Sequence, residues 1–280
     1  MDGSSFKLGL YVGRVVAIYS GEKGGTGKTT LSLLTTIFAD LHGYPVVYLD
    51  LSIDMDYLHL LFETIGEFVR RPGRHSYGIL DYLLGKCKLR DVLHGIEGRD
   101  NIVLIPAGQA RPEEVSKIDW KRLCMLVRRI AKVLGAYVIV DMPACRIVDP
   151  VNTVLTAADV IAFVAEETSE CLSYFAKHVQ LLKEYREVEN IVLIVNKART
   201  RDETALAKYL KHVNSLVKTW QYVNHVTAQR SLPELILRRY VYYLMTQDDL
   251  VIRELEAKMP PGRAYATKHT IQTLTLIKYS

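Results

Sequence analysis

Ten consecutive residues near the start of the chain have the composition of a phosphate-binding loop. They are Gly21, Glu22, Lys23, Gly24, Gly25, Thr26, Gly27, Lys28, Thr29 and Thr30. Glycines let successive backbone N–H groups turn toward one phosphate, a lysine reaches its outer oxygens, and a hydroxyl group ligates Mg²⁺. We therefore expect phosphate groups to lie against residues 24–30, with Lys28 on the outer oxygens and Thr29 on the metal ion.

The surrounding sequence predicts the strands and helices that would position this loop. Short apolar runs at residues 12–19, 45–49, 101–105, 137–140, 160–165 and 191–195 are typical of buried strands. Amphipathic stretches at residues 28–42, 120–134, 169–185 and 204–216 are typical of helices. Because strand and helix alternate, we expect a doubly wound α/β fold, in which a mostly parallel sheet carries helices on both faces. No linker or repeat divides the chain, which predicts a single domain over residues 1–280.

Polar residues follow several of these apolar runs. Asp141 comes directly after residues 137–140, Asp50 after residues 45–49, and Asn196 with Lys197 after residues 191–195. A carboxylate at the carboxyl end of a parallel strand lies beside the crevice that holds a phosphate. Asp141 is therefore a candidate metal ligand, and a helix-capping aspartate is the alternative.

The segment KGGTGKTT at residues 23–30 resembles the deviant Walker A motif of the ParA/MinD family of P-loop ATPases. In that family a second lysine, here Lys23, reaches across a dimer to the nucleotide of the partner. The resemblance covers about residues 12–260 and leaves 261–280 as a divergent tail. It implies ATP and ADP as ligands together with Mg²⁺, and a homodimer that forms when ATP binds.

Two further segments match the same family. Asp141 begins the segment Asp-Met-Pro-Ala, which matches its D-x-P-A segment, where the aspartate holds Mg²⁺ through water. Asn196 and Lys197 occupy the place where similar proteins set an asparagine against the adenine edge, whose donors and acceptors an amide can match. A simple turn asparagine is the alternative.

One position departs from the family pattern. After the second predicted strand the family has D-x-D, whereas this chain has Asp50-Leu51-Ser52, and serine cannot act as a carboxylate. The candidate catalytic residues are Lys23, Asp50 and Ser52. Hydrolysis is then slow, with ATP acting as a long-lived dimer clamp, or Asp50 or Asp54 substitutes for the missing carboxylate. Alternatively Ser52 is an N-cap for the helix that follows.

The net charge of +5 is concentrated at the end of the chain. Residues 1–200 carry 24 basic and 24 acidic side chains, and residues 201–280 carry 12 and 7. A basic region of this kind favours a polyanion such as DNA. ParA proteins bind DNA without sequence preference as ATP dimers, and the resemblance makes six residues candidates: Lys208, Lys211, Lys218, Arg230, Arg238 and Arg239. Solvated helix faces with a chance bias are the alternative.

These observations together predict an ATP-dependent dimerising switch that segregates or positions DNA or another large cargo. A small partner protein would stimulate hydrolysis or carry the cargo. A MinD-like membrane ATPase is the runner-up, because the tail at residues 269–280 alternates like a strand rather than an amphipathic helix. A non-hydrolysing scaffold and a metabolic P-loop enzyme remain as other classes. Four scattered cysteines without a CxxC pair argue against zinc and iron–sulfur sites, and the start lacks a signal peptide, so we expect the chain in the cytoplasm, associated with the nucleoid.

Overall fold

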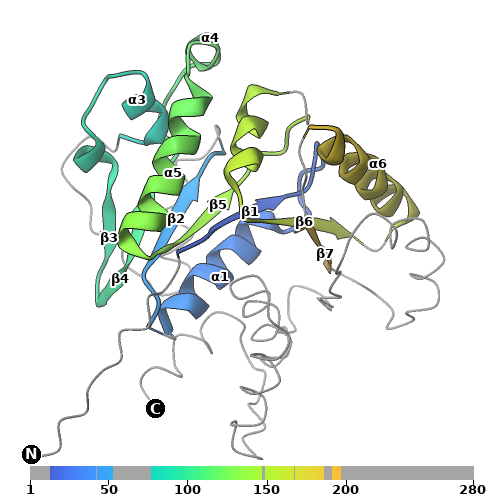
Figure 1. Ribbon diagram of the computed structural model, residues 1–280, viewed down its shortest axis with the longest axis horizontal. Coiled ribbons are helices and arrows are strands. Elements are labelled where there is room, and N and C mark those ends of the chain that lie inside the picture. The colour runs from blue at the N-terminus through green and yellow to red at the C-terminus, as the bar shows by residue number, and fades with distance from the viewer. Residues whose placement is uncertain are drawn as a thin grey trace, which may run out of the picture.

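The described part of the chain forms one seven-stranded sheet with helices on both faces (Figure 1). The computed structural model describes residues 13–41, 43–52, 77–146, 149–166, 168–185 and 191–196. In sheet order the strands are β3 (His94–Ile96), β4 (Arg99–Ile105), β2 (Val46–Asp50), β5 (Tyr137–Asp141), β1 (Val15–Tyr19), β6 (Val160–Glu166) and β7 (Ile191–Asn196). β3 runs antiparallel to β4, and all other neighbouring pairs are parallel. The expected doubly wound α/β class is confirmed.

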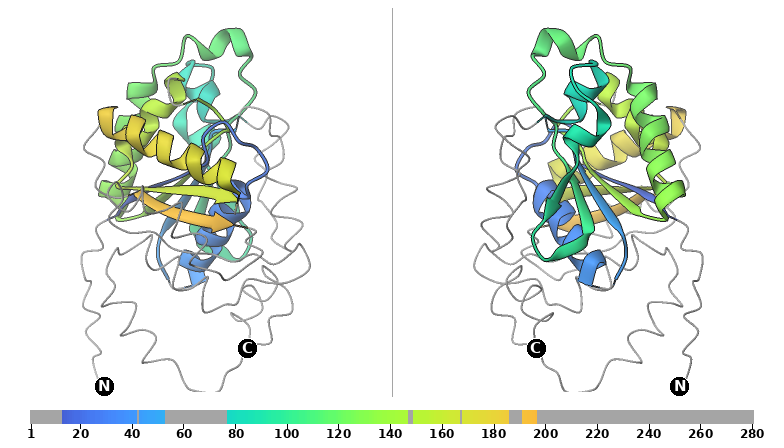
Figure 2. Two further views of the ribbon diagram at one scale, coloured as in Figure 1. Left: turned by 90° about the vertical axis from the view of Figure 1, so that its right-hand side faces the viewer. Right: turned by 90° about the vertical axis from the view of Figure 1, so that its left-hand side faces the viewer.

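The helices divide between the two faces of the sheet. They are α1 (Lys28–Leu41), α3 (Ile79–Leu83), α4 (Pro112–Val115), α5 (Trp120–Leu134) and α6 (Ser169–Tyr185), with 3-10 turns η1 (Leu89–Val92) and η2 (Pro150–Ala157). α1 packs its apolar side chains on one face, while α3, α5, η2 and α6 pack on the other (Figure 2). None of the helices in the described ranges is long and apolar enough to cross a membrane.

Most of these elements lie where the sequence predicts them. All six apolar runs form strands, although β1 begins at Val15 rather than at residue 12. α1, α5 and α6 occupy the predicted stretches, and the helix expected at residues 204–216 lies outside the described residues. β3 is not predicted because its three residues, His-Gly-Ile, are too few to show an alternating pattern.

The strand order places the carboxyl ends of several strands around the start of α1. β1 lies between β5 and β6, and the chain moves to one side through β2 and to the other through β6 and β7. Such a switch of direction opens a crevice beyond the carboxyl ends of the strands. The loop at residues 20–27 follows β1 at this point, and Asp50, Asp141, Glu166 and Asn196 end β2, β5, β6 and β7.

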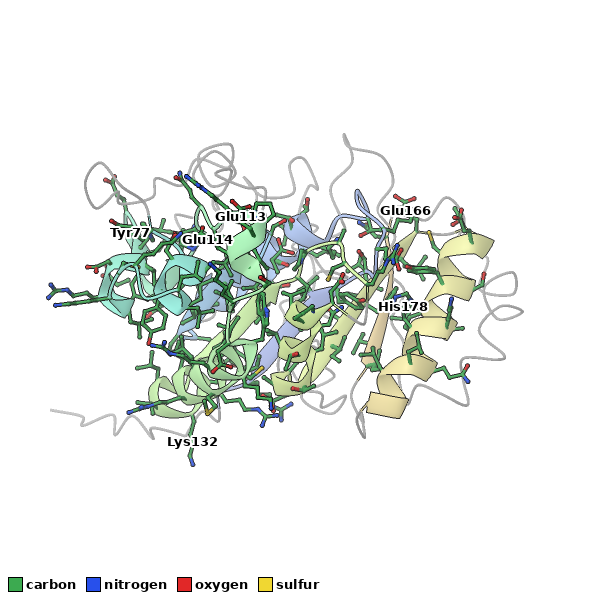
Figure 3. All side chains as sticks on the ribbon, turned by 90° about the horizontal axis from the view of Figure 1, so that it is seen from above. Tyr77, Glu113, Glu114, Lys132, Glu166 and His178 are labelled. Atoms are coloured by element: carbon green, nitrogen blue, oxygen red, sulfur yellow. The ribbon has the colours of Figure 1, made fainter. Side chains whose placement is uncertain are left out.

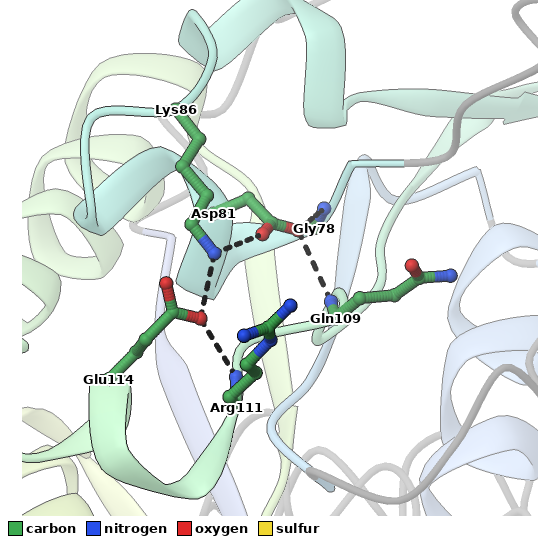
Figure 4. A network of polar contacts seen from close by, with 6 residues as sticks. All are labelled: Gly78, Asp81, Lys86, Gln109, Arg111 and Glu114. Carbon is green, nitrogen blue, oxygen red and sulfur yellow. Dashed lines mark hydrogen bonds and ion pairs between the residues drawn. The ribbon is translucent and has the colours of Figure 1, made fainter.

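A polar network fixes the loop that follows β4 at the same edge of the sheet (Figure 4). The buried carboxylate of Asp81 accepts backbone N–H groups from Gly78 at 3.1 Å and Gln109 at 3.2 Å. Lys86 contacts Asp81 at 3.6 Å and Glu114 at 2.9 Å, so it links α3 to α4. The edge that carries the candidate site is therefore held by side chains as well as by strand pairing.

Candidate functional site

Residues 20–27 form a tight loop between β1 and α1 that requires glycine. The φ angles of Gly21, Gly25 and Gly27 are 66°, 74° and 96°, a region that other residues enter only with strain. At Gly27 space is limiting as well, because a Cβ atom there would lie 2.3 Å from Nδ2 of Asn196. The backbone therefore has the curled shape that a phosphate cradle needs.

Asn196, at the end of β7, holds this loop by a hydrogen bond. Its Nδ2 donates a hydrogen bond of 2.7 Å to the carbonyl of Thr26, which lies 170 residues earlier in the chain. Asn196 is 6% exposed, so this bond is shielded from water. The structure thus shows Asn196 supporting the loop backbone, and its contact with an adenine base stays a prediction.

The ammonium group of Lys28 is buried at the first turn of α1, since the residue is 8% exposed. Its Nζ donates to Oγ of Ser20 at 2.8 Å, and that hydroxyl donates to the carbonyl of Lys23 at 2.8 Å. Burial lowers the pKa of Lys28, and the nearby carboxylate of Asp141 partly opposes this. A buried cation whose hydrogen-bond partner is a neutral hydroxyl favours a nearby anion.

Two carboxylates face each other at the carboxyl ends of β2 and β5. Asp50 and Asp141 are direct neighbours in the strand register, and each is 1% exposed. The backbone N–H of Ser52 donates to Oδ1 of Asp50 at 2.7 Å, and the hydroxyl of Tyr48 donates to Oδ2 of Asp141 at 3.2 Å. Burial, and second the charge of Asp141, raises the pKa of Asp50 to about 8.

The pKa of Asp141 is raised as well, and burial is the main cause. The hydroxyl of Thr29 lies close to this carboxylate and, with the ammonium of Lys28, acts in the opposite direction. Thr29 and Asp141 therefore lie together, as expected for two residues that serve one metal ion. A divalent cation beside them would favour the ionised carboxylate.

Two buried polar atoms in this crevice test whether a nucleotide phosphate with Mg²⁺ fits. Thr26 Oγ1 and Asp141 Oδ1 are buried, and neither has a hydrogen-bond partner of good geometry among the residues that the structure describes. Within the described ranges no three histidine, cysteine or acidic residues lie together as a metal site. One hydroxyl and one carboxylate suit Mg²⁺ that keeps phosphate and water as further ligands, and the ammonium with the glycine-rich backbone suits the phosphate. The residues fit the group.

Lys23 contacts its own chain across the mouth of the loop. Its Nζ donates to Sγ of Cys171 at 3.0 Å and lies 3.9 Å from Oε2 of Glu166. Glu166 ends β6 beside α6, the helix that also carries His178 (Figure 3). The hydrogen bond to Cys171 is the main cause that raises the pKa of Lys23, and the charge of Glu166 adds to it.

The other predicted site residues are placed as follows. Gly24, Gly25 and Thr30 are exposed on the loop and first turn of α1, where a ligand could reach them. Ser52 ends the described segment after β2, so the helix that it would cap and Asp54 are outside the described residues. Also outside them are Lys197 and the six DNA-binding candidates, Lys208, Lys211, Lys218, Arg230, Arg238 and Arg239.

Four residues at the site are not singled out by the sequence. Ser20 binds Lys28, Tyr48 binds Asp141, and Glu166 and Cys171 hold Lys23. The sequence does offer a signal for Tyr48, because its hydroxyl is the one polar side-chain group in the apolar run VVYL before Asp50. Cys171 carries none, because the contact depends on how α6 packs beside the loop.

Comparison with known proteins identifies the family of the chain. Residues 17–239 match the family described as the CobQ/CobB/MinD/ParA nucleotide binding domain, and the chain belongs to this family. A putative septum site-determining protein MinD of Oltmannsiellopsis viridis is 29% identical over 187 residues, which are 67% of this chain. The match covers 55% of that relative, so the chain spans just over half of its length.

Solved structures share the fold. The septum site-determining protein MinD of Pyrococcus horikoshii, complexed with Mg-ADP, has a TM-score of 0.55 and 24% identity, with 70% of this chain and 76% of that one covered. A ParA family ATPase of Chlorobium tepidum has a TM-score of 0.58 and 18% identity, over 95% of this chain and 98% of that one. At these identities the likeness establishes the arrangement of the sheet and helices.

The buried carboxylate of Asp50 leads to a prediction about stability and pH. Its pKa is 3.8 when unfolded and about 8 when folded, so the folded chain retains the proton over that range and the unfolded chain loses it. Without ligand, stability should therefore fall as pH rises from about 4 to 8, by at most about 1 kcal/mol per pH unit. Asp50→Asn, which keeps the Oδ1 acceptor, should reduce this fall and leave the part that comes from Asp141, whose pKa burial also raises, as measured by urea unfolding from pH 4 to 9.

Asp100→Asn, at an exposed position of β4, controls for the loss of one surface charge. If the Asp50→Asn and Asp100→Asn variants show the same pH dependence as the natural chain, Asp50 is not held in its protonated form.

Proposed function

We propose that the chain is an ATP-dependent dimerising switch of the ParA/MinD type. The observation that carries the proposal is the loop at residues 20–30, in which curled glycine backbone, a buried Lys28 and a second lysine at residue 23 surround one crevice. Membership of the nucleotide-binding family and the Mg-ADP bound to the Pyrococcus horikoshii relative support nucleotide and Mg²⁺ as the ligands.

The residues of the chain would divide the work as follows. Loop amides and Lys28 would bind phosphate oxygens, and Thr29 and Asp141 would hold Mg²⁺. Asn196 keeps the loop in shape, and Tyr48 orients the carboxylate of Asp141. When bound, Mg-ATP supplies the transferable phosphate and the charge that distinguishes the two states of the switch. Lys23 would reach the nucleotide of a second copy and so make dimerisation depend on it.

We propose nonspecific DNA as the surface on which this switch acts. The basic excess within residues 201–280 supports it, because a dimer doubles the number of phosphate contacts and each contact releases counterions. Segregation or positioning of DNA or another large cargo follows from such a cycle of binding and release, with a small protein partner that stimulates hydrolysis or carries the cargo.

A membrane-associated positioning ATPase is the second candidate. It is favoured by the name of the Oltmannsiellopsis viridis relative, a putative septum site-determining protein. The two candidates share the nucleotide switch and differ in the anionic surface that the dimer binds. They are therefore separated by binding to duplex DNA or to anionic vesicles.

The dimer is tested through Lys23. Sedimentation velocity should show a monomer with ADP and a dimer with ATP, and Lys23→Ala should weaken the ATP-dependent dimer at least about tenfold, since each dimer loses two charge-assisted contacts. Lys132→Ala removes a lysine at an exposed position of α5 and is the matched control. A Lys23→Ala chain that dimerises as well as the natural one would refute the proposed role of this lysine.

The same protein samples, tested with duplex DNA and with anionic vesicles, show which surface the dimer binds. The DNA proposal expects retardation of duplex DNA with ATP and not with ADP, weakening steeply as salt rises. Retention on anionic vesicles without any shift of DNA would instead establish the membrane candidate.

Hydrolysis is tested at Ser52. Where the family has a second aspartate this chain has serine, and the neighbouring Asp50 carboxylate already accepts the Ser52 N–H. If the missing carboxylate limits turnover, Ser52→Asp should raise the rate of phosphate release roughly a hundredfold, in the range that a positioned acid–base group contributes. An unchanged rate would mean that Asp50 or another residue already performs this role.

A further inference from the structure

We propose that Glu166 and Cys171 are positioning residues that hold Lys23 on its own chain, and that dimerisation requires this contact to break. The contact of Lys23 with Glu166 and Cys171, here called the tether, is argued from the structure alone. The claim that dimerisation must break it rests on the proposed function.

The amine end of Lys23 is held from two elements. Sγ of Cys171 accepts a hydrogen bond from Nζ at 3.0 Å, and Oε2 of Glu166 lies 3.9 Å from the same nitrogen. The side chains of Lys23 and Glu166 are 37% and 25% exposed, so the ion pair sits at the rim of the crevice, while Cys171 beneath it is 4% exposed. The carboxylate of Glu166 and the sulfur of Cys171 therefore share the ammonium group of Lys23.

The two acceptors are fixed in place by the fold. Glu166 is the last residue of β6 and pairs in register with Asn196 of β7. Cys171 lies in the first turn of α6, where its backbone N–H donates to Oγ1 of Thr168 at 3.2 Å. The backbone of Lys23 is anchored as well, because its carbonyl accepts the hydroxyl of Ser20. The lysine side chain can therefore move without a change in these backbone positions.

The tether and the proposed contact across the dimer exclude each other. One ammonium group cannot lie against Glu166 and Cys171 and at the same time reach the nucleotide of a second chain. A partly exposed ion pair shifts an equilibrium by less than about fivefold. A symmetric dimer must break two tethers, so the effects on the dissociation constant multiply. The tether therefore weakens the dimer modestly, and bound nucleotide on both copies must offset it.

Glu166→Gln tests this in the dimer. The substitution keeps the size of the side chain and removes its charge, so the ATP-dependent dimer should become about three- to tenfold tighter in sedimentation. Glu97→Gln, in the exposed turn between β3 and β4, makes the same change in net charge far along the sheet and should have no effect. In the Lys23→Ala background Glu166→Gln should also have no effect, because the two residues act through one contact.

A second readout in the free chain does not depend on the dimer. The pKa of the Lys23 amine, followed by NMR in the absence of nucleotide, should fall in Glu166→Gln and in Cys171→Ala, and Cys171→Ser should restore most of it by supplying another acceptor. Lys23→Arg identifies the resonance.

The outcomes separate the two proposals. An unchanged Lys23 pKa in both variants would show that the tether does not form. A lowered pKa with an equal or weaker dimer in Glu166→Gln would show that the tether forms without opposing dimerisation. If the natural chain and Lys23→Ala are both monomeric with ATP, the proposed function fails, and the pKa still decides whether the tether exists.

Discussion

The buried ammonium group of Lys28 constrains the whole site. It lies at the first turn of α1, where its one hydrogen-bond acceptor among the described residues is the hydroxyl of Ser20. Burying a charge is unfavourable unless an anion is near, and here the carboxylate that acts on Lys28, Asp141, is itself buried and has its pKa raised. The fold leaves the positive charge of Lys28 without a full negative counterpart, and a bound phosphate would supply it.

Several contacts hold the backbone and side chains around Lys28 in place. Three glycines with positive φ shape the loop, Asn196 pins it from β7, and Tyr48 orients Asp141 from within β2. Each of these contacts lies at the carboxyl edge of the sheet, where parallel strands end around the switch in strand order. Lys23 differs, because it is held by side-chain contacts at the rim and is the cation of the loop that can move without disturbing the backbone.

Much of the fold and part of the site could be predicted from the sequence because their signals are local. The buried strands are continuous apolar runs, and the phosphate loop is ten adjacent residues whose glycines and Lys28 indicate their own chemistry. The contacts that tune the site are not local. Asn196 meets Thr26 across 170 residues and Lys23 meets Cys171 across 148, and neither pair has a spacing that a linear pattern could reveal. β3 is not predictable because it is too short to show a period.

The central claim, that this loop is a cradle for the phosphates of an adenine nucleotide, is tested most directly by titration calorimetry with Mg-ATP and Mg-ADP. Both nucleotides should bind with one site per chain. Lys28→Met, which keeps the aliphatic stem and removes the charge, should weaken this binding by more than about tenfold, since a hydrogen bond to a charged group is lost. No heat of binding at millimolar nucleotide, or equal affinity in Lys28→Met, would contradict the central claim.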